Sequence, residues 1–144
     1  MKPGARRKAR QFALQAMYQW QLAGTDISAI EIQFFEDFDF KDTDKAYFRE
    51  LLYGIPKQAS TLDEYIRPLL DRSIDELGPV EWAILRISCY ELLNRLDVPY
   101  RVVINEGIEL AKVFGATEAH KYINGVLDKL AQQLRTMEIE ALKD

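Results

Sequence analysis

The chain has 144 residues, of which 48% are apolar and 29% are charged, and its formal net charge is −4. These values are typical of a globular domain that can bury a core, and they exclude an intrinsically disordered chain. The charge is unevenly distributed, because the first ten residues carry five basic side chains and no acid, which leaves −9 for the rest. A polyanion responds to such a local concentration of charge and not to the average.

Residues 1–10 ("MKPGARRKAR") are called the basic arm below. The segment that follows, "QFALQAMYQWQL", is interrupted by four glutamines and therefore lacks the apolar core of a secretion signal. Its apolar residues recur at the spacing of one helix face, which predicts a helix from Arg6 to about Leu22. From the residues alone, a flexible, solvated charge run is the favoured interpretation of the arm, and a surface for a polyanion is the alternative.

Helical spacing continues along the chain. We expect helices over Ile27–Phe38, over residues 44–72, and in three further segments that start near Pro79, Pro99 and Thr117. Pro56 and Pro68 interrupt the second of these regions, which predicts two helices or one kinked helix there. Alternating strand patterns are absent, so the predicted fold is all-α, a compact bundle of about six to seven helices. We expect one domain over 1–144, in two packed helical subdomains at roughly 1–72 and 79–140.

Residues suited to catalysis are scarce. Cys89 is the single cysteine and lies in an apolar helical stretch, which favours a buried core position. His120 is the single histidine and lacks a recognisable nucleophile context. The glycines form no phosphate-binding loop, and the acids fall at helix ends and on solvated faces. No apolar run is long enough to span a membrane. We therefore expect no enzyme activity, no cofactor and no metal.

Three blocks carry a family resemblance: "VEWAILRISCYELL", "INEGIELAKVFG" and "HKYINGVLDKL". Together with the basic arm and its helix, they resemble the NusB family of bacterial transcription antitermination factors over nearly the whole chain. The resemblance implies a NusB-like helical fold. It also implies a cytoplasmic factor that binds boxA RNA together with the ribosomal protein NusE. With NusA and NusG, such a factor joins elongating RNA polymerase and supports transcription, termination control and antitermination in ribosomal RNA operons.

The resemblance also reverses the preference for a solvated arm and implies an RNA-binding set: Lys2, Arg6, Arg7, Arg10, Lys121 and Tyr122. Arginine forks suit phosphates and stack on unpaired bases. An aromatic ring beside a cation, such as Tyr122 beside Lys121, provides a stacking platform. The alternative for Tyr122 is that its ring seals the margin of the core with a wet hydroxyl.

For NusE, the resemblance implies a second set: Tyr18, Asp75, Glu76 and Glu81. Acids near a helix start are also stabilised by the helix dipole, so a structural role remains the alternative for each of them. Two other functions stay open at this point. One is an RNA-targeting partner domain of a ribosomal RNA methyltransferase, and the other is a protein-only adaptor.

Overall fold

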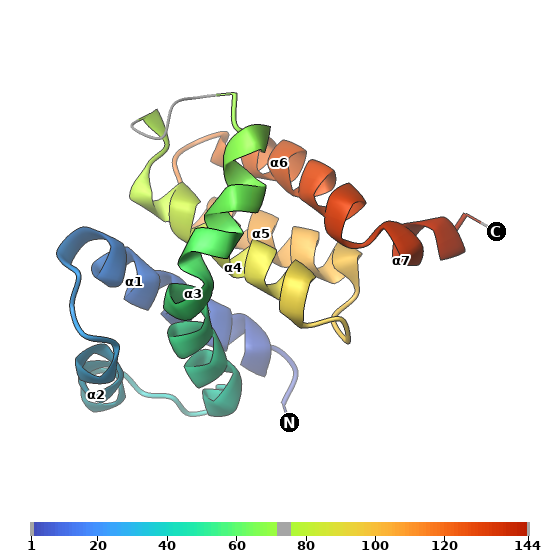
Figure 1. The fold of residues 1–144 in the computed structure, drawn as a ribbon. Helices are drawn as coiled ribbons and strands as arrows, with labels where there is room; N and C mark the ends of the chain where they lie inside the picture. Colours follow the sequence, from blue (N-terminus) through green and yellow to red (C-terminus); the bar gives the residue numbers. More distant parts are fainter. Residues whose placement is uncertain (1, 72–75, 144) are drawn as a thin grey trace. The chain divides into compact units, whose positions relative to one another are not determined.

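The computed structural model describes residues 2–71 and 76–143, in which helices are joined by loops and strands are absent. They form seven α-helices and one short 3-10 helix (Figure 1): α1 (Ala5–Ala23), α2 (Ile27–Asp37), α3 (Lys45–Ile66), η1 (Arg67–Leu69), α4 (Pro79–Asn94), α5 (Tyr100–Phe114), α6 (Ala119–Leu134) and α7 (Thr136–Ala141). The predicted all-α class is therefore confirmed.

The chain divides into two compact units, residues 1–58 and 59–144. The boundary falls inside α3, whereas the sequence placed the division later, between residues 72 and 79. α3 continues through Pro56 as one helix, and the chain first departs from α-helix at η1, which contains Pro68. A proline inside a helix removes one backbone hydrogen bond, a cost that packing on both sides can offset.

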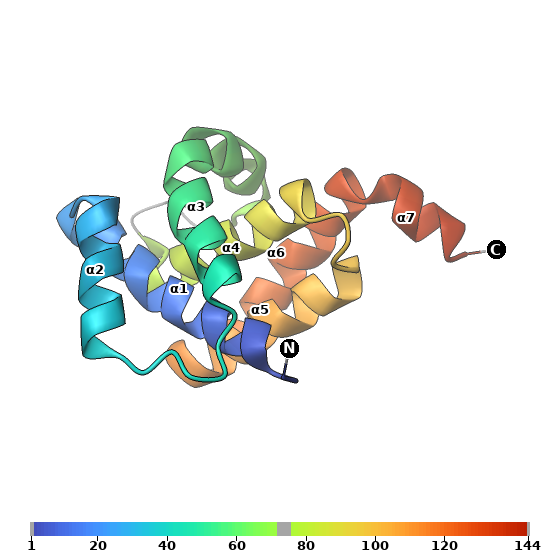
Figure 2. The same ribbon diagram turned by 90° about the horizontal axis from the view of Figure 1, so that it is seen from below.

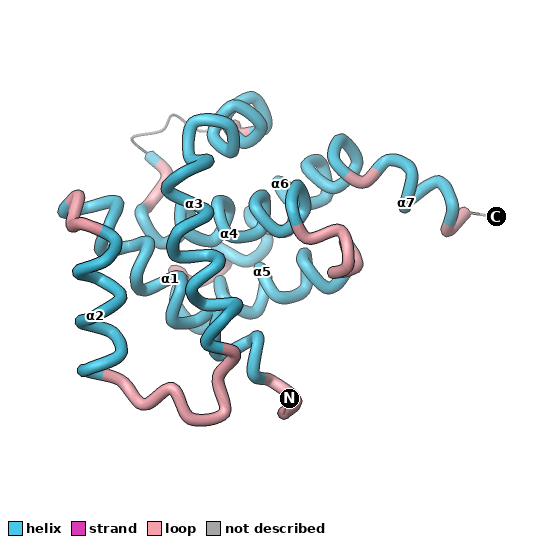
Figure 3. Tube along the Cα trace, turned by 60° about the horizontal axis from the view of Figure 1, so that its bottom comes forward, coloured by secondary structure: helices cyan, strands magenta, loops and turns pink. Residues whose placement is uncertain are grey.

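The first unit holds α1, α2 and the greater part of α3 (Figure 2). Its core is a cluster of phenylalanine rings in which Phe12 stacks on Phe40 with centroids 4.3 Å apart. Phe48 of α3 meets the Phe40 ring at 5.0 Å and the Phe34 ring of α2 at 6.0 Å. Phe40 belongs to the loop between α2 and α3, the pink segment that Figure 3 shows between these helices. Burial of large rings therefore fixes a loop as well as the helices.

The start of α3 is tied to the start of α1. The Asp44 carboxylate accepts a hydrogen bond from the backbone N–H of Tyr47 at 3.0 Å, which is an N-cap contact. The backbone N–H of Asp44 donates to the carbonyl of Ala5 at 3.1 Å. In the sequence, Asp42, Thr43 and Asp44 are all suitable caps for this helix, and the structure uses Asp44. This junction positions the basic arm.

In the second unit, α4, α5 and α6 pack on one another. α4 is buried on nearly all sides, from Trp82 to Leu92. Gly107 of α5 is a point of close approach, because a Cβ atom there would lie 2.7 Å from Leu127 Cδ1 and 2.9 Å from Ser88 Oγ. The sequence predicts such a contact, because Gly107 and Ala111, four residues apart, leave room for a neighbouring helix, and the structure confirms it.

Two details of the predicted last helix are wrong. The helix cap is Glu118, at φ 72°, and not Thr117. The sequence pattern also predicts one apolar stripe from Ile123 to Met137, but α6 ends at Leu134 and Met137 lies on the separate helix α7, 88% exposed. The break occurs at Arg135, whose backbone leaves the helical region at φ −126° and ψ 35°.

Arg135 is buried and donates to the end of α4. Its guanidinium bonds the backbone carbonyls of four residues and the carboxylate of Glu138, at 2.7 to 3.1 Å: Glu91, Leu92, Arg95 and Val98. The last carbonyls of a helix have no partner within the helix. Arg135 therefore satisfies the carboxyl end of α4, and the chain leaves α6 so that this side chain can turn inward.

Candidate nucleic-acid interface

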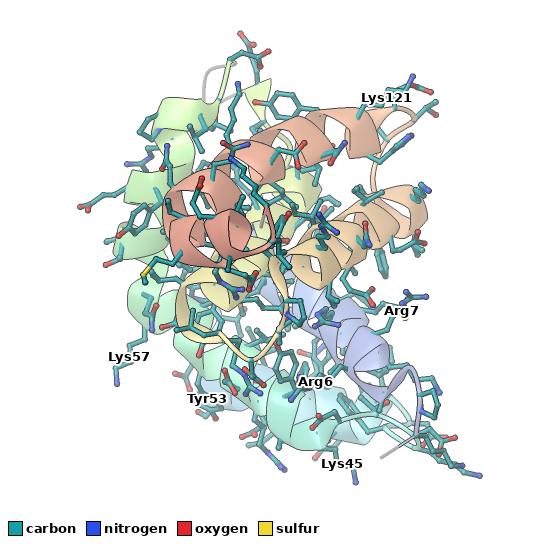
Figure 4. All side chains as sticks on the ribbon, turned by 90° about the vertical axis from the view of Figure 1, so that its right-hand side faces the viewer. Arg6, Arg7, Lys45, Tyr53, Lys57 and Lys121 are labelled. Carbon is teal, nitrogen blue, oxygen red and sulfur yellow. The ribbon has the colours of Figure 1, made fainter. Side chains whose placement is uncertain are left out.

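The basic arm is not a flexible charge run. α1 begins at Ala5, after Gly4 adopts a left-handed conformation at φ 83°. The cations from Arg6 onward therefore lie on the first turns of a helix, at fixed angles to one another. In Figure 4, Arg6 and Arg7 leave the start of α1 on different sides.

Arg6 and Arg10 share one partner, the ring of Tyr47 on α3. The guanidinium carbon of Arg6 lies 4.5 Å from the ring centroid, and that of Arg10 lies 5.4 Å from it. Residues four apart share a helix face, which explains the common partner. Arg6 keeps a side chain that is 40% exposed, whereas Arg10 is only 3% exposed. The expectation that Arg10 offers its charge at the surface needs correction: Arg10 lies beneath Arg6 and supports Tyr47.

Lys2 and Arg6 form ion pairs with acids of the same unit. Lys2 Nζ lies 2.9 Å from Asp42 Oδ1, and Arg6 Nε lies 3.6 Å from Asp44 Oδ2. Both cations remain substantially exposed, and Arg7 and Lys8 are exposed as well. The Lys2–Asp42 pair is exposed, and exposed pairs of this kind contribute at most about 1 kcal/mol. The Arg6–Asp44 pair differs, because the Asp44 side chain is only 11% exposed.

At 100° per residue, Lys8 points away from the arginines of the basic arm, so the RNA-binding set given above leaves it out. The structure places it at the rim of an open pocket of about 400 Å³. Lys41 lies at the same pocket, together with the amide side chains of Gln11 and Gln15. The sequence shows that Lys8, Gln11 and Gln15 share one face of α1, because they are spaced i, i+3, i+7. It does not show that Lys41, from the loop before α3, lines the same pocket.

The second predicted contact, at Lys121 and Tyr122, lies on the first turn of α6. Both residues line an open pocket of about 190 Å³, which Lys129 also lines. Lys121 is exposed and pairs with Glu118 at 2.5 Å. Tyr122 and Lys129 are seven residues apart and so share a helix face. The seven-residue spacing therefore could have identified Lys129 as a neighbour of Tyr122 from the sequence alone.

The residues expected to meet a protein partner are spread over both units. Tyr18 is exposed on α1 in the first unit. Glu76 is exposed, and the Glu81 side chain folds back over Gly78, so that a Cβ atom there would lie 2.5 Å from Glu81 Oε2. Glu81 lies in the first turn of α4, where its negative charge interacts favourably with the helix dipole. Asp75 lies outside the described residues.

The chemistry of the site is that of a binding surface. Cys89 is buried, as predicted, and burial raises the pKa of its thiol to about 12. Within residues 2–71 and 76–143, no group of three or more His, Cys, Asp or Glu side chains is arranged to hold a metal ion. Helices in that part of the chain also lack the combination of length and hydropathy needed to cross a bilayer.

Comparison with known proteins identifies the family. The family model described as the NusB family matches residues 7–132. Transcription antitermination protein NusB of Alcanivorax borkumensis is 62% identical over 136 residues, which cover 94% of this chain and 91% of the relative. The protein of the same name in Pseudomonas fluorescens Pf0-1 is 58% identical over 142 residues, which cover 99% of this chain and 86% of the relative.

A solved structure of T. maritima NusB matches with a TM-score of 0.74 and 31% sequence identity, covering 88% of this chain and 89% of that one. The resemblance first drawn from three blocks of sequence thus extends over nearly the full length and to the fold. The chain belongs to the NusB family.

Proposed function

We propose that this chain is a cytoplasmic transcription antitermination factor that binds boxA RNA together with NusE. In this proposal the pair joins elongating RNA polymerase with NusA and NusG and supports transcription of ribosomal RNA operons. The NusB family consists of transcription antitermination factors and not of enzymes. The RNA, the partner proteins and the residues that contact them are the proposed part.

The observation that carries the proposal is the helical basic arm. The first turn of α1 carries Arg6, Arg7 and Lys8, and Lys2 lies just before the helix. Lys2, Arg7 and Lys8 are exposed, Arg6 is partly exposed, and the first ten residues contain no acid. Arginine binds phosphate oxygens through paired N–H groups, and the amino end of a helix adds a positive dipole. A single strand that crosses this end of the first unit would meet several cations already held in position.

Arg6 is held at the start of α3, and its side chain stays 40% exposed. Tyr47 supports one face of the guanidinium, and the Asp44 carboxylate lies 3.6 Å from Arg6 Nε. A phosphate that accepted paired hydrogen bonds from the guanidinium would make charge-assisted contacts. Arg10 contributes indirectly in this proposal, because it fills the space under the same ring.

The second unit supplies another proposed contact. Tyr122 lies between Lys121 and Lys129 at an open pocket on α6. Stacking of a base on an aromatic side chain stabilises a complex by about 1–3 kcal/mol, and the flanking lysines suit the adjacent phosphates. For the partner protein, the proposed contacts include Tyr18 in the first unit and Glu76 in the second, and both side chains are exposed. An acid such as Glu76 suits a basic ribosomal protein.

A titration of boxA-type RNA against wild type and Arg7→Glu, each with and without NusE, tests the proposal. One charge-assisted phosphate contact is worth about 1.5–3 kcal/mol, so the substitution should weaken RNA binding at least tenfold. Lys143→Glu, which reverses a charge near the carboxyl end, is the matched control and should bind as wild type does. Equal affinity of Arg7→Glu and wild type would contradict the RNA contact. If the affinity for NusE is the same with and without RNA, the result would favour a protein-only adaptor.

A further inference from the structure

A row of three cations and one tyrosine on α3 lies outside every site discussed above. Its members follow one another at intervals of four residues and are called the α3 ridge: Lys45, Arg49, Tyr53 and Lys57. All four side chains are exposed, with Arg49 at 52% and Tyr53 at 43%. Figure 4 shows Lys45, Tyr53 and Lys57 along one edge of the first unit. Residues at this interval form an inclined row on a helix.

The α3 ridge begins beside the first turn of α1. Lys45 follows Asp44, whose N–H donates to the carbonyl of Ala5 and whose carboxylate faces Arg6. The first turn of α1 and the first turn of α3 therefore meet, so the ridge starts next to the basic arm within residues 1–58. From Lys45 to Lys57 the ridge extends about 18 Å, at 1.5 Å per residue.

The middle of the ridge is held rigid by Glu31 of α2. Its Oε2 accepts from Arg49 Nε at 2.8 Å, and its Oε1 accepts from the Tyr53 hydroxyl at 2.9 Å. The Arg49 guanidinium also lies over the Phe35 ring, 4.7 Å from its centroid. The carboxylate offsets one positive charge, but it fixes the tyrosine hydroxyl and leaves the ring at the surface. The hydrogen bond to Glu31 raises the pKa of Tyr53, so the tyrosine stays uncharged beside an anion.

The ends of the ridge carry charge that nothing in the described chain neutralises. Lys45 and Lys57 have no ion-pair partner within residues 2–71 and 76–143. An apolar or cationic partner would leave these charges uncompensated, so the surface fits an anionic partner. An exposed aromatic ring between cations favours a single-stranded nucleic acid over an acidic protein, because a base can stack on the ring while phosphates meet the lysines.

We infer that the α3 ridge is a second RNA track, along which a single strand continues after it leaves the basic arm. This inference rests on the proposed RNA function and extends it, because it assigns residues 45–57 to RNA outside the segment held by the arm. Each step of four residues advances about 6 Å along α3, which is comparable with the spacing of phosphates in an extended strand. Three phosphates can therefore meet Lys45, Arg49 and Lys57.

The test uses the full chain and three synthetic RNAs: a boxA-type strand of about 6 nucleotides, and the same strand with about 6 uridines added at its 5′ or its 3′ end. Binding is measured for wild type and for Lys45→Gln/Lys57→Gln. The variant should bind the short RNA as wild type does, and should lose the added affinity that wild type gains from one of the extensions. For that extended RNA, the log-log salt slope should fall in magnitude by about 1.4, at about 0.7 per lost contact.

Tyr53→Leu should weaken binding of the same extended RNA at least about fivefold, which corresponds to the lower end of base stacking. The matched control is Lys112→Gln/Lys143→Gln, which removes the same charge from exposed positions of the second unit and should leave all three affinities unchanged. Thermal unfolding of each variant should match wild type, because the substituted side chains are exposed.

The inference is overturned if wild type gains no affinity from either extension, or if the ridge variant binds the extended RNAs with wild-type affinity and salt slope. Loss of binding to poly-glutamate with RNA binding unchanged would assign the ridge to an acidic protein instead. The proposed function fails separately, through the basic arm: wild-type affinity of Arg7→Glu for the short RNA would refute it whatever the ridge does.

Discussion

Replacement of Arg135 by methionine should destabilise the second unit more than any surface substitution. Methionine keeps most of the apolar stem but removes every donor that the guanidinium gives to the carbonyl groups at the end of α4. The side chain is 4% exposed, so water cannot replace these donors without opening the structure. Glu138 would also lose its partner at 3.0 Å.

The magnitude follows from the number and kind of these bonds. A hydrogen bond that involves a charged group contributes about 1.5–3 kcal/mol, but bonds made by one side chain are not additive. Loss of one partner from a buried charged network costs about 3–5 kcal/mol, and we expect a value in this range. Total stabilities of small proteins are about 5–15 kcal/mol, so the substitution removes a large fraction. At about 2–4 °C per kcal/mol, Tm should fall by roughly 6–20 °C.

Urea and thermal unfolding followed by circular dichroism measure this effect. Arg101→Met is the control, because Arg101 is an exposed arginine on α5 that bonds only its neighbour Tyr100, and its loss should cost less than about 1 kcal/mol. Arg135→Lys should recover little of the lost stability, because one ammonium group cannot reach all the carbonyls arranged around the planar guanidinium. A loss below about 1 kcal/mol for Arg135→Met would refute the assigned role of these bonds.

Three further substitutions or conditions give distinct outcomes. Gly107→Ala should destabilise by about 1 kcal/mol in urea unfolding, because overpacking against Leu127 costs about 1–3 kcal/mol and better helix propensity returns about 1 kcal/mol; a stabilised variant would contradict the close contact. Cys89 should resist thiol reagents at pH 8 until the protein unfolds. Burial raises the pKa of the Cys89 thiol from 9.0 to about 12, so only the unfolded thiol ionises between these pH values. The contribution of Cys89 to stability should therefore be complete below pH 9 and decline from pH 9 to 12. Cys89→Ala should lack this decline. Asp44→Asn should keep the helix cap and the melting temperature but release Arg6 from its carboxylate, so RNA affinity should rise; unchanged affinity would argue against a phosphate contact at Arg6.

The helices were predictable because their signals are local. Spacing of apolar residues located six helices, and prolines at 79 and 99 located two of the starts. Apolar spacing predicts an inward face of α5 made of Ile104, Ile108, Ala111 and Phe114, and this is only partly correct. Ile104 and Ala111 are buried, whereas Ile108 and Phe114 are half-buried. The helix packs against both α4 and α6, and periodicity alone cannot assign a face with two partners.

The features that the sequence did not predict depend on contacts between distant residues. The turn into α7 exists because Arg135 reaches carbonyls about 40 residues earlier in the chain. Arg10 is buried because Tyr47, on another helix, covers the same face as Arg6. The α3 ridge has a clear spacing in the sequence, but its rigidity comes from Glu31 on α2. Charge alone predicted a basic surface, and only the packing shows which cations reach it.

The most direct measurement of the RNA interface is the salt dependence of boxA-type RNA binding by wild type and by Arg6→Gln/Arg7→Gln. If the four arm cations Lys2, Arg6, Arg7 and Lys8 contact phosphates at about 0.7 each, a plot of log affinity against log salt concentration should have a slope of about −2.8. Contacts by all five arm cations would give a slope of about −3.5. The double variant should lose about 1.4 from this slope and bind at least tenfold more weakly. A wild-type affinity that does not change with salt, or a double variant with the wild-type slope, would contradict an RNA interface built on the basic arm.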